Sequence, residues 1–172
     1  DLAGYPAATS DVVALAVFDH QTRALNLITR LGWEVRVAAH EGRVPLETPA
    51  VTTTLADLVD YLLFVGEAPM PGGLRGSSGF AEWFSARGAR DAKGRTLHVL
   101  DLSTRLMRYP LSYTIESAAF DALPGEIRAE VYRGLARVLV AGDPAPKYAH
   151  LTAADRRAVV EGGEADVAVG HR

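Results

Sequence analysis

The chain has 172 residues and a formal net charge of −3, with 48% hydrophobic and 23% charged residues. This is the composition of an ordinary globular domain that is long enough for one substantial core. The acidic balance argues against a nucleic-acid partner. Because cysteine is absent, disulfides, zinc ribbons, iron–sulfur clusters and covalently bound haem are excluded. The longest apolar runs fall short of the roughly 20 residues that a transmembrane helix needs.

The first predicted helix is the longest. Ser10 is a suitable N-cap residue, and Asp11 follows it at the positive end of the helix dipole. Apolar residues then recur at steps of three and four from Val13 to Ala38. This spacing predicts an amphipathic helix over about residues 11–40, broken or bent near Gly32.

A second buried helix and a long loop follow. Thr54-x-x-Asp57 has the pattern of a capping box, which predicts that the second helix begins there and ends near Gly66. Residues 69–79 are rich in glycine and proline and predict a loop. A short third helix is expected from Phe80 to Arg87, where Gly88 stops it.

The pattern of the rest of the chain also predicts mostly helices. Residues 96–100 are the only strand candidate, and Asp101 and Ser112 can each cap a short turn. Pro124 suits the first position of a strong helix that ends at Gly142.

The last predicted helix begins at a second capping box, Thr152-x-x-Asp155, and runs to about Glu161. The sequence therefore predicts a single all-α domain over residues 1–161, a helical bundle of five to seven helices with one long Gly/Pro loop. Residues 162–172 are expected to form a frayed tail.

The loop PMPGGLRGSSGF, residues 69–80, matches no phosphate-binding or nucleophile motif. It lacks the Lys and the preceding strand of a Walker loop, the Gly-x-Gly-x-x-Gly fingerprint, and the Gly-x-Ser-x-Gly elbow. In the structural interpretation, Ser77 or Ser78 accepts hydrogen bonds from the amides of the helix that starts at Phe80. The functional alternative is a small-anion site formed by Arg75, Ser77 and Ser78.

His20 lies on the apolar face of the first helix, where an imidazole needs a polar partner. It is either a core histidine bonded to a neighbouring segment, or a base or a ligand for a metal or haem in an interhelical pocket. Neither Glu-x-x-His nor His-Glu-x-x-His occurs, so any metal site would combine different helices. The other histidines, His40, His98, His150 and His171, are interpreted as surface residues at loops or helix ends.

The segment after the third helix is locally basic. Its cations are Arg87, Arg90, Lys93 and Arg95. Such a cluster is either a solvated loop or a docking site for an acidic partner.

Two long segments resemble a domain found in uncharacterised secreted bacterial proteins. They are GSSGFAEWFSARGARDAKGRTLHVLDLSTRLMRYPLSYTIESAAFDALPGEIRAEVYRGLARVL, residues 76–139, and DVVALAVFDHQTRALNLITRLGWEVRVAAHE, residues 11–41. With residues 54–67 and 151–161, the resemblance covers most of the chain. The pattern includes the His20–Gln21 pair and Arg-Asp-x-Lys-Gly-Arg at residues 90–95. This chain departs from it at Leu111, where the family often has Cys, and after Glu161, where Gly-Gly replaces a longer helix.

The resemblance implies a c-type-cytochrome context and no known activity, so no catalytic residue is transferred. We therefore expect a non-catalytic, periplasmic or secreted binding or scaffold domain, without covalent haem. Its partner would be a protein, namely a c-type cytochrome or another redox or membrane-complex subunit. A start at Asp1, without Met or an apolar leader, suits a processed secreted chain or a fragment of a longer one. The alternative is a metal- or haem-dependent enzyme that uses His20.

Overall fold

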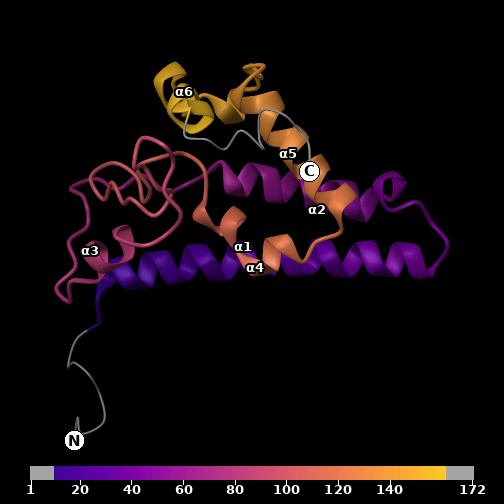
Figure 1. Cartoon of the computed structure of the whole chain (residues 1–172), viewed down its shortest axis with the longest axis horizontal. Coiled ribbons are helices and arrows are strands. Elements are labelled where there is room, and N and C mark those ends of the chain that lie inside the picture. The colour runs from indigo at the N-terminus through magenta and orange to yellow at the C-terminus, as the bar shows by residue number, and fades with distance from the viewer. Residues whose placement is uncertain (1–9, 162–172) are drawn as a thin grey trace, which may run out of the picture.

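The computed structural model describes residues 10–161, which fold into α-helices joined by loops and short 3₁₀ helices (Figure 1). The α-helices are α1 (Val12–His40), α2 (Pro49–Leu62), α3 (Phe80–Ser85), α4 (Ala118–Asp121), α5 (Gly125–Leu139) and α6 (Ala153–Glu161). The 3₁₀ helices are η1 (Pro45–Glu47), η2 (Tyr113–Glu116) and η3 (Pro146–Tyr148). Within the described residues there is no β-strand, and the prediction of an all-α fold with five to seven helices is confirmed.

Helix α1 spans the molecule as an unbroken rod, and the other elements pack on one side of it (Figure 1). Of the predicted break or bend near Gly32, the break does not occur, because this residue lies inside a continuous helix. The predicted N-cap is also wrong by one residue. Asp11 caps the helix instead of Ser10, and its Oδ1 accepts hydrogen bonds from the amides of Val13 (2.8 Å) and Ala14 (3.1 Å).

Helix α2 begins earlier than its capping-box pattern predicted. Thr48 is the N-cap and Pro49 occupies the first helical position, where the missing N–H costs nothing. Thr54 lies inside the helix and is fully buried, so its hydroxyl caps no helix end. The predicted capping box was therefore wrong, although the predicted helix exists.

The core lies between α1, α2 and α5. Fully buried leucines such as Leu31, Leu58 and Leu135 come from these three helices, and Phe120 of α4 joins them. Helices α2 and α5 come close together at Gly134. A Cβ at this position would lie only 2.9 Å from Cγ2 of Val59.

The segment between α3 and η2 is irregular, so the predicted strand over residues 96–100 is wrong. Its only ladder contact in the described chain is an isolated antiparallel bridge between Leu100 and Met107. The segment is held by side chains instead of by a sheet. Oε1 of Glu67, after α2, accepts a hydrogen bond from the amide of Leu106 at 2.9 Å.

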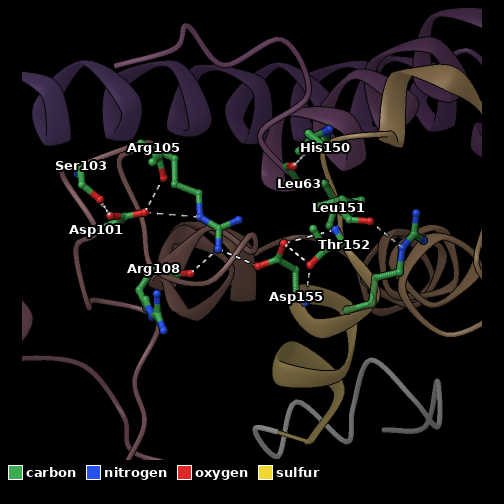
Figure 2. Close-up of polar contacts among 11 residues, drawn as sticks. Leu63, Asp101, Ser103, Arg105, Arg108, His150, Leu151, Thr152 and Asp155 are labelled. Carbon is green, nitrogen blue, oxygen red and sulfur yellow. Dashed lines mark hydrogen bonds and ion pairs between the residues drawn. The ribbon is translucent and has the colours of Figure 1, made fainter. Parts of the chain in front are cut away.

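Arg105 ties this segment to α6 (Figure 2). Its Nη2 donates to Oδ1 of Asp155 at 2.6 Å and to the carbonyl of Arg108 at 2.8 Å. Asp155 also closes the predicted capping box, because its Oδ2 accepts from the hydroxyl of Thr152 and its amide donates to that hydroxyl. This capping box is confirmed.

The predicted helix α5 exists but begins one residue later, because Pro124 is the N-cap and Gly125 the first helical residue, and it ends at Leu139 instead of at Gly142. The tail predicted for residues 162–172 lies outside the described residues. Among the described helices, none combines the length and the apolar character needed to cross a bilayer.

Candidate functional site

The glycine-rich loop holds a carboxylate, and that carboxylate belongs to Asp11. Its Oδ2 accepts hydrogen bonds from the amides of Ser77 and Ser78, both at 3.0 Å, and from the hydroxyl of Ser78 at 2.6 Å. The side-chain and backbone bonds from Ser78 are the main reason why the pKa of Asp11 lies well below its usual range. A single carboxylate thus caps α1 and closes the loop.

Gly76 explains why the loop can approach so closely. A Cβ at this position would lie 2.6 Å from Oδ2 of Asp11, so only glycine fits without a shift. Ser78 Oγ also accepts from the amide of Phe80 at 3.3 Å, as the structural interpretation predicted. Because Asp11 already uses the amides of the predicted anion site, an external anion would have to displace it. Arg75 is exposed beside these serines.

The His20 side chain is buried among aromatic rings. Its ring stacks on Tyr61 and Phe64, with centroid distances of 5.1 and 4.8 Å. Its Nε2 lies 2.7 Å from Oγ of Ser112, and that oxygen lies 2.8 Å from the hydroxyl oxygen of Thr114. This environment matches the interpretation of a core histidine bonded to a neighbouring segment.

The Ser112–His20 pair has the atoms of a nucleophile and its base, but it lacks access. Ser112 is 0% exposed and His20 is 6% exposed, so no substrate reaches the hydroxyl in this conformation. Burial lowers the pKa of His20 to about 4, which leaves the ring neutral at pH 7. A metal or haem iron at Nε2 would have to break the bond to Ser112. In this conformation, His20 and Ser112 form a structural hydrogen bond.

Two of the four basic-loop cations are neutralised within the chain. Nζ of Lys93 pairs with Glu161 at 2.9 Å, and Nε of Arg95 pairs with Asp91 at 2.6 Å. The second pair is the less exposed, and Asp91 also accepts from two backbone amides of its own loop.

The other two cations, Arg87 and Arg90, have no carboxylate partner in the described part of the chain. The Arg87 guanidinium carbon lies 3.9 Å from the ring centroid of Trp83, which is a cation–π contact. Within residues 10–161, the one acceptor bonded to Arg90 is the carbonyl of Gly94, at 2.8 Å. Trp83 is 52% exposed. We call these three residues, Trp83, Arg87 and Arg90, the Trp83 surface.

Sequence reasoning missed a group beside Gly88, which lies between Arg87 and Arg90 in the sequence. His98 was interpreted as a surface residue, but its side chain is only 15% exposed and packs against Phe84 and Tyr113. Its Nδ1 lies 3.8 Å from Oε2 of Glu116 and has no hydrogen-bond partner among the described residues. Burial lowers the pKa of His98 and raises that of Glu116.

Two hollows meet at Glu116. One, of about 410 Å³, is lined by His98 and Tyr113, and the other, of about 140 Å³, by Arg90 and Arg95. His98 lies in an irregular segment and Glu116 ends the short 3₁₀ helix η2, so no spacing in the sequence could have paired them. The one feature of the sequence that pointed to this region was the nearby basic cluster.

The described residues contain no group of three histidine or acidic side chains placed to hold a metal ion. The structure thus brings Arg90 and Arg95 together at one hollow and places His20 in the core. The serines of the glycine-rich loop lie on Asp11.

Comparisons with known proteins identified no relative of the chain. No family model matches the chain, and neither a curated protein nor a solved structure matches it.

Proposed function

We propose that the chain is a non-catalytic docking domain that binds an acidic region of a protein partner through the Trp83 surface. The observation that carries this proposal is the stack of Arg87 on an exposed Trp83, with no carboxylate paired to Arg87 in the described residues. Tryptophan and arginine are enriched among the residues that dominate protein–protein affinity.

The chemistry of this surface favours a carboxylate-bearing partner. An arginine held on an aromatic ring has lost part of its side-chain freedom before binding, so a partner's carboxylate can pair with it at a smaller entropic cost. Arg90 adds a second cation at the edge of the smaller hollow. Nη2 of Arg95 is buried in the wall of that hollow and has no hydrogen-bond acceptor among the residues that the structure describes, and an entering oxygen would supply one.

The proposed kind of partner is motivated by the expectation, drawn from the sequence, that the chain resembles domains in c-type-cytochrome contexts. We propose a c-type cytochrome or another subunit of an electron-transfer complex, met in the periplasm or outside the cell. The domain would position this partner without carrying haem covalently, since it has no cysteine.

The test is a fluorescence-anisotropy titration of the full chain with a labelled hexaglutamate peptide. Saturable binding that weakens as salt is added is expected, because the contacts are exposed ion pairs. Arg87→Ala and Arg90→Ala should each weaken it. Lys93→Ala is the matched control, since Glu161 already neutralises this cation, and should bind as the parent chain does. No binding by the parent chain, or equal weakening by Lys93→Ala, would contradict the proposal.

A further inference from the structure

The outer face of α1 carries exposed apolar side chains at both ends. Leu15 is 54%, Phe18 66% and Trp33 63% exposed, and the rest of the fold lies on the opposite side of this helix (Figure 1). These side chains form two separate apolar sites, because Phe18 and Trp33 lie 15 residues, or about 22 Å, apart along the helix.

Between these ends the face is uncharged. Thr22, Asn26 and Thr29 are exposed and continue from Phe18 to Trp33 at steps of three and four residues, which keeps them on one face of the helix. The face opposes the buried one, whose positions include Val17, His20 and Ala24. We call the six residues Leu15, Phe18, Thr22, Asn26, Thr29 and Trp33 the α1 outer face.

The α1 outer face is complementary to itself in the antiparallel sense. Phe18 and Trp33 lie equally far, along the chain, from a point between residues 25 and 26, and so do Thr22 and Thr29. A twofold axis at that point places Phe18 against Trp33 of a second copy, and Thr22 against Thr29. Asn26 lies beside the axis, where its amide can meet its own equivalent, as a single asparagine does when it fixes the register of a coiled coil.

Charge supports the same arrangement. Asp19 and Arg30 lie about three turns apart, on the same edge of the outer face. The twofold axis brings Asp19 close to Arg30 of the second copy and repeats the pair at the other end. Asp19 has no ion-pair partner among the described residues, whereas Arg30 is 57% exposed and contacts Glu34 of its own helix at 2.7 Å.

We propose that two copies of this chain associate through antiparallel contact of their α1 outer faces. The proposed dimer is independent of the Trp83 surface. One helix from each copy makes an interface smaller than that of a standard permanent dimer, so the association is expected to be weak and concentration-dependent.

Sedimentation velocity over a range of concentrations tests the association. The parent chain should shift from monomer toward dimer as concentration rises, and Phe18→Asp and Trp33→Asp should each stay monomeric with unchanged helix content by circular dichroism. Val44→Asp is the control, because Val44 is also exposed, at 56%, but lies outside α1 and outside the Trp83 surface, and it should still associate. A parent chain that is monomeric throughout, or a dimer that survives both α1 variants, would overturn the proposal.

Introduced cysteines test the antiparallel register, since the chain has no cysteine of its own. Mixing Thr22→Cys with Thr29→Cys should give a disulfide-linked heterodimer on mild oxidation. Thr22→Cys alone should not cross-link, because its two copies would lie roughly 10 Å apart along the helix, beyond disulfide reach. Efficient cross-linking of Thr22→Cys alone would indicate a parallel pair and overturn the proposed geometry.

Discussion

Asp11 joins two segments that are far apart in the sequence. The same carboxylate caps α1 and accepts three hydrogen bonds from Ser77 and Ser78. From the sequence, Asp11 can be recognised only as an acidic residue near the start of a helix. Nothing in the sequence links it to a loop more than sixty residues away.

The Asp11→Ala change should therefore open the glycine-rich loop as well as weaken the start of α1. We expect a lower melting temperature and faster trypsin cleavage after Arg75, which lies in that loop. Ser77→Ala is the control, since Ser77 contributes only its backbone amide. If both variants are cleaved at the parent rate, Asp11 does not hold the loop.

The pH dependence of stability should report on His20. Its pKa falls from 6.5 in the unfolded chain to about 4 in the folded one, mainly because burial penalises the charged ring. Between these values only the unfolded chain binds the proton, so the free energy of unfolding should rise with pH from about 4 to about 6.5. The expected rise is about 3 kcal/mol.

Urea unfolding across this pH range measures the effect. His20→Gln should remove most of the slope, whereas His40→Gln, at an exposed position at the end of α1, should keep it. His98 contributes in the same direction, because burial also lowers its pKa. An unchanged slope in His20→Gln would show that the buried imidazole does not govern the transition.

At the scale of the elements, the packing of α2 on α5 depends on Gly134. Gly134→Ala should destabilise the fold by about 1–3 kcal/mol, since the new Cβ would press on Val59. Gly125→Ala is the matched control, because a Cβ there meets nothing within 4 Å. Urea unfolding should separate the two variants. Equal stability of both would mean that Val59 moves aside without cost.

Helical periodicity predicted the elements better than their ends. The long apolar stripe of α1 and the Thr152–Asp155 box predicted real structure, because each depends on neighbours within the same helix. The capping box predicted at Thr54 was wrong, because a threonine in this sequence pattern can also be buried inside a helix, as Thr54 is. The strand predicted for residues 96–100 failed because a short segment forms a strand only where a second strand pairs with it, and here side chains hold the segment.

The candidate surface was predictable only in part. The basic cluster could be read from sequence, but which of its cations are free could not, since the partners of Lys93 and Arg95 depend on the folded loop and on α6. His20 was located correctly on the buried face, while its partner Ser112 lies 92 residues away along the chain and could not be inferred.

At the scale of the whole molecule, both proposed binding surfaces lie outside the core, and the core residues serve packing. His20 is bonded inside it, whereas Arg87, Arg90 and the exposed aromatic residues lie outside. A docking domain needs only a rigid frame of this kind, whose surface can bind a partner without a change in the backbone.

The most direct measurement is affinity purification of the tagged full chain from its native host, followed by a haem stain of the bound fraction. The parent chain and Lys93→Ala should retain a haem-staining c-type cytochrome that salt elutes, and Arg87→Glu should lose it because its reversed charge repels an acidic partner. Recovery of the same cytochrome by Arg87→Glu, or of no redox protein by the parent chain, would contradict the account.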